Sequence, residues 1–393
     1  MKKVLIIGAS ILQLPAIRKA KELGYYVGVA DYNPNAIGIP YANEYFNVST
    51  IDVDGVVEVA KKFQPDGIMT LATDMPMRAV ATACKELGLP GISTETALKA
   101  TDKGEMIQAF EKHKVEHPWY AIIPNRDALT EQLEKMTYPC IMKPTDNAGS
   151  RGVVLCHNAD DVISNYEYTH AESRSGAVII EEYLQGPEFS IEVMVVNGEP
   201  HVLQITDKNT TGAPHFVEMG HTQPTSQPED IQSKIKDLAR RAVKAVGINV
   251  GPAHVEMILT AQGPKMVELG ARMGGDCITT HLVPLSTGID MVAATIKLAC
   301  GEEADITPKW NKGAAIRYFD TPVGVLKSID GIEEAKAIPG VQEISFVHGA
   351  GEKVGEIGSS VDRIGFVIAQ GDNTILAVDT CEKVLHTITF DID

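Results

Sequence analysis

Residues 1–97 alternate between short apolar runs and longer segments in which apolar residues recur every three or four positions. Short apolar runs predict buried β-strands, and the longer periodic segments predict amphipathic helices. The expected strands are 3–10, 25–33 and 66–74, and the expected helices are 15–24, 53–64 and 75–88. Strands that alternate with helices of about ten residues indicate βαβ units. We therefore predict an N-terminal domain with a doubly wound parallel sheet.

After a strongly helical connection at 93–115, the pattern changes to strands joined in hairpins. The segment 188–207 alternates apolar and polar residues around Asn197-Gly198, which predicts a hairpin with a type I′ turn. A second hairpin is expected from 253 to 271. Further helices are expected at 159–173, 229–247 and 289–301. The tail 313–393 is rich in glycine and β-branched residues and predicts a small, mostly β unit, so the fold class is α/β at the N-terminus and α+β overall.

Composition limits the function classes. The chain has 393 residues, and its hydrophobic share of 44% is that of an ordinary globular protein large enough for several structural units. The net charge of −17 argues against a broad nucleic-acid footprint and against an anionic membrane surface. No window approaches the ~18 consecutive apolar residues of a membrane span. We expect neither nucleic acid nor a membrane as a partner.

The six cysteines are scattered without a C-x-x-C spacing. This distribution favours free thiols in a reducing compartment over a zinc site or a disulfide framework. The basic and apolar N-terminus is short and leads into a Gly/Ser turn, so it predicts a first strand rather than a signal peptide. We therefore expect a cytoplasmic protein.

The stretch 141–153 joins an apolar strand to a flexible polar loop. Lys143 ends the strand, and the loop contains Gly149, Ser150, Arg151 and Gly152. Glycines let backbone N–H groups approach oxygen atoms closely, and a lysine beside them supplies a fixed cation. These are the ingredients of a polyphosphate site, although the Walker A pattern is absent. The alternative is an ordinary hairpin turn whose lysine reaches solvent, and this stretch alone leaves both open.

The segment 178–192 is a candidate nucleoside pocket. Glu181 and Glu182 end a β-branched run, and Glu188 follows a Gly-Pro turn. A strand-to-loop backbone can bind the edge of adenine while a nearby carboxylate binds the ribose hydroxyls. An exposed strand end is the alternative. A dinucleotide site at Gly8 is a weaker one, because the second and third glycines of G-x-G-x-x-G are missing.

Glu256 and Glu268 occupy the two arms of the second expected hairpin, each between apolar residues. Pairing of these arms brings the two carboxylates together, and their repulsion favours a cation between them. Oxygen ligands alone suit Mg²⁺. Arg272, four residues after Glu268, is well placed to hold an anion beside that metal. The alternative is a solvated strand face with a lysine neighbour.

Together, these stretches resemble the ATP-grasp superfamily of carboxylate–amine ligases, including bacterial L-amino-acid (dipeptide-forming) ligases and the branch of biotin carboxylase and carbamoyl phosphate synthetase. The resemblance rests on the order of six degenerate motifs over about residues 1–310. They are Lys103 in TDKGEM, Lys143 in YPCIMKP, NAGSRGV, EEYLQGPEF, VEMIL and VELGAR.

The resemblance implies four parts within an ATP-grasp fold. These are a Rossmann-like N-terminal domain at 1–97, a helical linker with a mobile lid subdomain at 98–184, a catalytic subdomain at 185–312 and a small C-terminal unit at 313–393. The N-terminal domain of such proteins does not bind the nucleotide, which removes the dinucleotide interpretation of Gly8. A homodimer is the assembly that the resemblance suggests, although no sequence feature fixes a dimer face.

The resemblance also implies roles around the phosphates of ATP. Lys103 and Lys143 contact the α- and β-phosphates, and residues 147–152, with Gly149, Ser150, Arg151 and Gly152, close over the β- and γ-phosphates. Glu256 and Glu268 ligate Mg²⁺, for which Mn²⁺ can substitute, and Arg272 lies over the transferred phosphoryl group. Many relatives have an asparagine two residues after the second glutamate, whereas this chain has Gly270. The number of metal ions therefore stays open.

The nucleoside would be held by the segment 181–188. Glu181 would face the adenine amino group, the backbone of Glu182, Tyr183 and Leu184 would bind the adenine edge, and Glu188 would bind the ribose. The acceptor pocket is less defined. Glu218 and His221 form an E-x-x-H arrangement similar to one in L-amino-acid ligases, where an acid and a histidine receive the incoming amine. A surface histidine in a proline-rich loop is the alternative.

The implied activity is an ATP-dependent ligase that activates a carboxylate, plausibly that of an amino acid, as an acyl phosphate. An amine then displaces phosphate, and ADP is released. One alternative is a bicarbonate-dependent carboxylase or a nucleotide-biosynthetic ligase of the same superfamily. A second alternative is a regulatory protein that binds the nucleotide without turnover.

Overall fold

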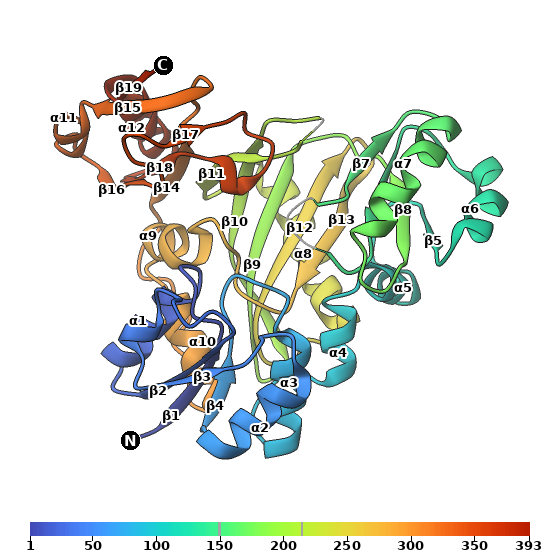
Figure 1. Cartoon of the computed structure of the whole chain (residues 1–393), viewed down its shortest axis with the longest axis horizontal. Coiled ribbons are helices and arrows are strands. Elements are labelled where there is room, and N and C mark those ends of the chain that lie inside the picture. Colours follow the sequence, from blue (N-terminus) through green and yellow to red (C-terminus); the bar gives the residue numbers. More distant parts are fainter. Residues whose placement is uncertain (148–150, 214) are drawn as a thin grey trace.

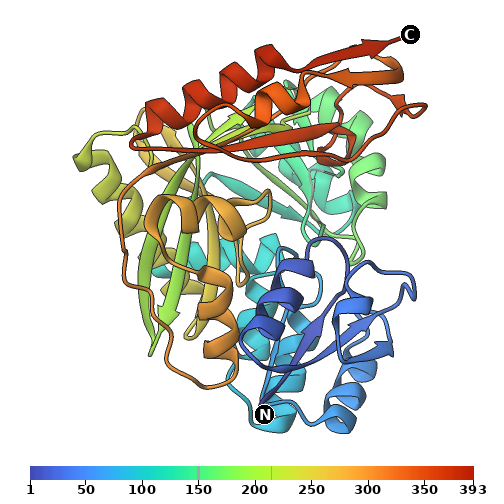
Figure 2. The same cartoon turned by 90° about the vertical axis from the view of Figure 1, so that its left-hand side faces the viewer.

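The computed structural model of the chain describes residues 1–147, 151–213 and 215–393. Its N-terminal part contains the predicted parallel sheet, in the order β3-β2-β1-β4 (Figures 1 and 2). The elements up to the first helical connection are β1 (Lys3–Ile7), α1 (Leu14–Glu22), β2 (Tyr26–Asp31), η1 (Ile39–Tyr41), β3 (Glu44–Asn47), α2 (Val53–Phe63), β4 (Gly67–Met69), α3 (Met77–Leu87), α4 (Thr94–Lys99) and α5 (Lys103–His113).

Alternation along β1 explains how this sheet is covered on both faces. Val4 and Ile6 face a core that includes α1 and the distant helix α10 (Met291–Ala299). Leu5 and Ile7 face the opposite core, which α2 and α3 complete. Successive side chains of a strand point to opposite faces, so a run without polar residues requires helices on both sides. The doubly wound arrangement is therefore confirmed.

A four-stranded antiparallel sheet, β5-β8-β6-β7, follows and carries α6 and α7 on its outer side (Figure 1). Its helices begin at asparagine caps, since Asn125 and Asn158 accept hydrogen bonds from the first turns of α6 and α7. The elements are β5 (Tyr120–Ile123), α6 (Arg126–Gln132), η2 (Leu133–Lys135), β6 (Cys140–Pro144), β7 (Val154–Cys156), α7 (Ala159–Ala171) and β8 (Val178–Glu182).

The largest sheet has eight strands in the order β13-β12-β9-β10-β11-β14-β18-β16. Both predicted hairpins lie in it, and Asn197 and Gly198 at the β9–β10 turn have the positive φ angles of 52° and 80° that a type I′ turn requires. The elements of this region are β9 (Glu188–Val196), β10 (Glu199–Thr210), β11 (Glu218–Gln223), α8 (Glu229–Val246), β12 (Gly251–Thr260), β13 (Gly263–Gly270), η3 (Ile278–Leu282), α9 (Val283–Thr287) and α10.

The C-terminal segment joins this sheet instead of standing beside it. Strand β14 pairs with β11 on one side and with β18 on the other. A further sheet, β17-β15-β19, and the helices α11 and α12 complete the unit, in which strand residues outnumber helical residues, as expected for a mostly β unit. Its elements are β14 (Gly313–Tyr318), β15 (Gly324–Asp330), α11 (Ile332–Lys336), β16 (Val341–Phe346), β17 (Lys353–Val354), η4 (Ser360–Asp362), β18 (Gly365–Gly371), α12 (Thr374–Thr387) and β19 (Thr389–Ile392).

Among the described residues, no single helix is long and apolar enough to cross a bilayer. The segments Ile278–Thr287 and Met291–Ala299 meet the length and composition criteria only as a pair that is bent by 115°.

Candidate active site

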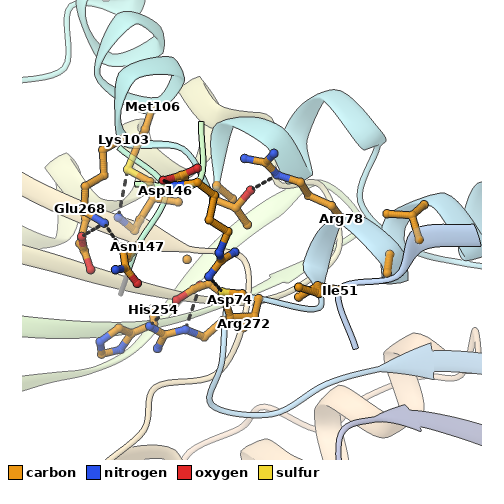
Figure 3. Close-up of a pocket in the computed structure, with 18 residues that line it drawn as sticks. Ile51, Asp74, Arg78, Lys103, Met106, Asp146, Asn147, His254, Glu268 and Arg272 are labelled. Carbon is orange, nitrogen blue, oxygen red and sulfur yellow. Dashed lines mark hydrogen bonds and ion pairs between the residues drawn. The ribbon is translucent and has the colours of Figure 1, made fainter. Parts of the chain in front are cut away.

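Two adjoining cavities lie between the sheets. The first, which we call the Glu188 cavity, has a volume of about 190 Å³ and lies between the sheet of β6 and β8 and the large sheet. The second, which we call the Asp74 cavity, has a volume of about 330 Å³ and lies beside the N-terminal domain (Figure 3). Lys103, Asn147 and Glu268 line both cavities. A reacting group at these residues is therefore within reach of ligands in either cavity.

Lys143 and Glu181 form a buried ion pair in the Glu188 cavity. The pairing of β6 with β8 places Ile141 opposite Glu181, so Lys143 lies two residues further along the same face. Its Nζ is 2.6 Å from Glu181 Oε2, and both side chains are 7% exposed. The lysine therefore points into the protein, and the hairpin interpretation in which it reaches solvent does not apply.

Lys103 lies at the start of α5, where the Asp102 side chain caps the first turn. Its Nζ donates to the Asn147 carbonyl at 2.8 Å and lies 3.0 Å from Glu268 Oε2. Burial opposes the charge of Lys103, but attraction to Glu268 raises its pKa above the usual value. The wall between the two cavities thus carries a stable cation.

Glu256 and Glu268 are direct partners in the register of β12 and β13, as expected from the hairpin. Glu256 Oε2 is 3.2 Å from Lys208 Nζ, and its Oε1 is 3.1 Å from His254 Nε2. Burial opposes ionisation of Glu256, but these two cations lower its pKa well below the usual value. The pKa of Glu268 is also lowered, since Lys103 outweighs burial and the charge of Glu256. Both groups are therefore ionised at neutral pH.

This pair of carboxylates fits a hard cation such as Mg²⁺, which binds few protein oxygens and keeps water or phosphate as its other ligands. Among the described residues, no group of three or more His, Cys, Asp and Glu side chains is arranged to hold a metal ion. A metal at this site would thus depend on ligands from outside the protein, as the phosphates of a nucleotide would provide.

Arg272 forms a bidentate pair with Asp74 across the second cavity, with two N–O distances of 3.0 Å (Figure 3). This contact explains the glycine at 270, because a Cβ atom there would lie 2.2 Å from Asp74 Oδ1. The residue that departs from the expected asparagine therefore makes room for Asp74. Asp74 comes from the loop between β4 and α3, so the N-terminal domain contributes directly to this site.

The segment expected to hold the nucleoside lines the Glu188 cavity through Glu181, Glu182, Tyr183, Leu184 and Glu188. The Glu182 N–H donates to the Trp119 carbonyl as part of the β5–β8 ladder, while its carboxylate binds Lys265 at 2.8 Å. The side chain of Glu182 is thus held on the neighbouring strand β13, at one end of the cavity.

The predicted phosphate loop is described only in part. Gly149 and Ser150 lie outside the described residues. Arg151 lines the Glu188 cavity and donates to Asn147 Oδ1 at 2.9 Å. Gly152 has a φ of +74°, and a Cβ atom there would lie 2.8 Å from Pro144. A glycine is therefore required at 152 by the backbone, independently of any ligand.

The structure separates Glu218 from His221. Both lie on β11, and residues three apart on a strand face opposite sides of the sheet. Glu218 lines the Glu188 cavity, 3.5 Å from Lys208, whereas His221 is 1% exposed and lines neither of the two cavities. Its Nε2 is 3.2 Å from Asp276 Oδ2, and its Nδ1 has no hydrogen-bond partner among the described residues.

Asp276 is the centre of a contact between the C-terminal unit and the segment after β13. Arg363 binds its two oxygens at 2.8 and 2.9 Å and stacks 3.7 Å from the centre of the Tyr318 ring. Burial opposes ionisation of Asp276, but His221 and Arg363 lower its pKa. His221 thus takes part in a buried network that fixes the C-terminal unit.

Three further residues escaped the sequence analysis: Lys208, His254 and Glu192. His254 Nδ1 is 2.5 Å from Glu192 Oε1, while His254 Nε2 binds Glu256. Burial opposes protonation of His254, yet attraction to Glu192 raises its pKa to about 9. The signal in the sequence was a charged residue within an apolar strand, as in FSIEVMVV around Glu192.

Comparisons with known proteins agree with this geometry. Residues 136–280 match the family model of the ATP-grasp domain, and residues 317–393 match that of the L-amino acid ligase C-terminal domain 2. Alanine–anticapsin ligase of Bacillus subtilis is 27% identical over 324 residues, which cover 76% of this chain and 67% of the relative. Phosphoribosylamine–glycine ligase of Methanosarcina barkeri is 26% identical over 349 residues, covering 82% of this chain and 78% of the relative.

Among solved structures, the L-amino acid ligase from Bacillus licheniformis superposes with a TM-score of 0.86 at 23% identity, over 100% of this chain and 99% of that chain. Phosphoribosylglycinamide synthetase from Anaerococcus prevotii superposes with a TM-score of 0.80 at 25% identity, over the whole of both chains. The arrangement of sheets described above is therefore that of these two proteins.

Proposed function

We propose that this chain, which contains the ATP-grasp domain at residues 136–280, is a carboxylate–amine ligase that joins the carboxylate of one amino acid to the amino group of another. The observation that carries this proposal is the meeting of the two cavities at Lys103 and Glu268. A nucleotide in the Glu188 cavity would place its terminal phosphate at this junction, beside a carboxylate held in the Asp74 cavity. The similarity to alanine–anticapsin ligase supports amino acids as the substrates.

In this proposal, ATP occupies the Glu188 cavity. Lys103 and Lys143 contact its phosphates, and Arg151 and Gly152 belong to the loop that closes over them. The segment 181–184 binds adenine and Glu188 binds the ribose. The presence of Lys103, Lys143 and Arg151 in the lining of this cavity supports this orientation, since charged donors in a site shielded from water offset the negative charge of phosphates most effectively. Glu256 and Glu268 would hold Mg²⁺ or Mn²⁺, which would neutralise charge on the phosphates.

The proposed reaction begins when a carboxylate oxygen attacks the γ-phosphorus and the bond to the β-phosphate oxygen breaks. ADP leaves, and the product is an acyl phosphate. The amine nitrogen then attacks the acyl carbon, loses a proton and displaces inorganic phosphate. Arg272 is near the shared wall and would stabilise charge on the transferred group, once Asp74 shares its guanidinium with the substrate. Exclusion of water matters because acyl phosphates hydrolyse readily.

The position of His221 bears on the acceptor. Glu218 remains a candidate for contact with a ligand because it lines a cavity. His221, by contrast, would have to act through Asp276 or after a rearrangement, because its side chain is buried in the contact with the C-terminal unit. We therefore assign Glu218 to the site and treat His221 as a positioning residue.

The test is to incubate the protein with ATP, Mg²⁺ and pairs of amino acids, and to measure ADP, phosphate and the condensed product by mass spectrometry. The expected result is substrate-dependent ADP release with a dipeptide of matching mass. Glu268→Gln serves as the control and should form product far more slowly than the wild type. Release of ADP without a condensed product from any pair would contradict the proposal. A requirement for bicarbonate would identify a carboxylase instead, and nucleotide binding without turnover would identify a regulator.

A further inference from the structure

Lys208, on β10, is a buried lysine surrounded by carboxylates. Its side chain is 3% exposed, and its Nζ is 2.6 Å from Glu188, 3.2 Å from Glu256 and 3.5 Å from Glu218. The three glutamates come from three different strands, β9, β12 and β11. A single ammonium group on β10 therefore contacts carboxylates from three other strands of the large sheet inside the Glu188 cavity.

The charges of these groups do not balance. Three carboxylates face one ammonium group. Burial opposes the charge of Lys208, but attraction to Glu256, Glu188 and Glu218 raises its pKa well above the usual value. The pKa of Glu188 is raised, first by burial and then by the neighbouring carboxylates, although Lys208 opposes this shift. The ammonium group of Lys208 thus lies within 3.5 Å of three carboxylates that otherwise repel one another.

The net charge of the residues that line the Glu188 cavity also shows an excess of carboxylates. The described residues that line the Glu188 cavity include six glutamates, three lysines and one arginine, which gives a net charge of −2. Lys103 and Lys143 each pair with one carboxylate, Glu268 and Glu181, whereas Lys208 is shared by three. A nucleotide with a di- or triphosphate would add several negative charges to this cavity. If Lys208 were absent, the nucleotide would meet a net charge of −3 on the described residues that line the cavity.

Glu256 connects Lys208 to the candidate metal site. One oxygen of Glu256 contacts Lys208 and the other contacts His254, so both are engaged by cations of the protein. A divalent cation that binds Glu256 has to share an oxygen with Lys208 or with His254. The lysine and the metal ion would thus neutralise the same carboxylate.

We propose that Lys208 is an internal counter-cation that performs part of the electrostatic task of the divalent metal, so that the nucleotide can enter the cavity before a metal ion is in place. This inference rests on the proposed nucleotide site. It assigns to Lys208 a role in positioning Glu188, Glu218 and Glu256 and in offsetting the charge of the phosphates. It follows that loss of Lys208 makes nucleotide binding more dependent on metal.

The experiment measures ADP affinity by isothermal titration calorimetry, with excess EDTA and with excess Mg²⁺, for the wild-type protein and for Lys208→Met. We expect Lys208→Met to weaken binding in EDTA at least tenfold and to weaken binding in Mg²⁺ by less than threefold. In a second measurement, binding of Mn²⁺ alone is followed by electron paramagnetic resonance. Lys208→Met should bind Mn²⁺ more tightly than the wild type, because the carboxylates have lost their internal cation.

Lys265→Met is the matched control, because Lys265 is also a mostly buried strand lysine, and among the described residues its one ion pair is with Glu182. Its effect on ADP affinity should be equal in EDTA and in Mg²⁺. Lys208→Arg keeps the charge and should restore binding in EDTA. If Lys208→Met does not fold, as judged by circular dichroism, the variant Lys208→Met/Glu218→Gln lowers the excess negative charge and is compared with Glu218→Gln in the same two titrations.

The outcomes distinguish this inference from the proposed function. An equal loss of ADP affinity in EDTA and in Mg²⁺, or no loss, would overturn the role of Lys208 and leave the nucleotide site intact. Unchanged Mn²⁺ affinity in Lys208→Met would also count against it. Failure of the wild-type protein to bind ADP under either condition would instead overturn the nucleotide site itself.

Discussion

The Glu188 cavity and the Asp74 cavity share a wall but are built differently. In the Glu188 cavity, the lysines are paired with carboxylates from neighbouring strands, as in Lys143–Glu181 and Lys208–Glu188. The Asp74 cavity combines the loop after β4 and helix α3 with the segments around Asp146 and Arg174 and the end of β13. Two of its arginines, Arg78 and Arg174, form no ion pair within residues 1–147, 151–213 and 215–393. Each lysine of the first cavity is thus already paired with a carboxylate, and the carboxylates remain in excess, whereas in the described part of the second cavity two arginines are not engaged in an ion pair.

The two cavities therefore differ in how far their side chains are fixed before a ligand binds. Paired charges in the Glu188 cavity fix side chains before any ligand is bound, which lowers the cost of ordering them later. Arg78 and Arg174 are exposed, and Arg78 donates to the Thr101 hydroxyl while Arg174 donates to Met75 Sδ. Neutral partners of this kind are readily exchanged for a substrate carboxylate. We therefore expect variants in the first cavity to affect folding and nucleotide binding, and variants in the second to affect the choice of substrate.

The largest effect is expected for Lys143→Met. It removes one member of a buried ion pair and leaves the Glu181 carboxylate without it, which typically destabilises a protein by about 3–5 kcal/mol. The free energy of unfolding is measured by urea denaturation at pH 7. The double variant Lys143→Met/Glu181→Gln should recover most of the loss. If Lys143→Met were as stable as the wild type, the Lys143–Glu181 ion pair would not be effectively buried.

Glu268→Gln should have the next largest effect, this time on turnover. The change removes the charge from a residue on the wall shared by the two cavities while keeping its size. We expect kcat to fall by roughly 10²–10³-fold, the loss found when one electrostatic contact to a transition state is removed. Steady-state ADP release and ADP affinity are measured in parallel. Unchanged turnover would remove Glu268 from the mechanism.

Arg78→Gln and Arg174→Gln test the second cavity. Loss of one exposed charged contact to a carboxylate corresponds to about a tenfold rise in the KM of at least one amino acid substrate. The KM for ATP should stay within a factor of about two, because neither arginine lines the Glu188 cavity. Arg18→Gln, on the helix α1, is a surface control. If the KM for ATP rose as much as the KM for the amino acid, the two cavities would not bind different substrates.

The smallest effect concerns Asp276, which lines neither cavity. Its pKa is lower in the folded than in the unfolded protein, so it stabilises the fold above pH ~4, and this contribution is lost as the pH falls further. Between pH 5 and pH 3, the stability advantage of the wild type over Asp276→Asn should shrink by about 1 kcal/mol. Urea denaturation at both pH values measures this change. A constant difference would contradict the ionised contact with Arg363.

Much of the Glu188 cavity could be predicted because its residues fall in local patterns. Lys143 ends an apolar strand, and Glu256 and Glu268 have a spacing that a hairpin converts into direct neighbours. The same logic failed at Glu218 and His221. The E-x-x-H spacing suggests two side chains that act together, but the segment is a strand, on which residues three apart face opposite sides. Sequence spacing reveals proximity only where the intervening secondary structure is known.

The Asp74 cavity could be predicted only in part: the sequence motifs point to Lys103, Glu268 and Arg272, which line it, but not to the contact that Arg272 makes with the N-terminal domain. Asp74 and Arg272 are separated by 198 positions, and no local pattern marks them as partners. Gly270 was recognised as a departure from the pattern, but its reason is steric and becomes apparent only when Asp74 is in place. Lys208 was missed for a related reason, because its three carboxylates come from strands whose order in the sheet does not follow their order in the chain.

The position of β14 in the large sheet has a consequence for protein engineering. This strand is hydrogen-bonded to β11 and to β18, so the central sheet continues without a break into the last eighty or so residues of the chain. A chimera that takes its C-terminal part from a relative must therefore reproduce an edge-to-edge match along β11. Cutting the chain before β14 would leave β11 as an open edge that invites self-association.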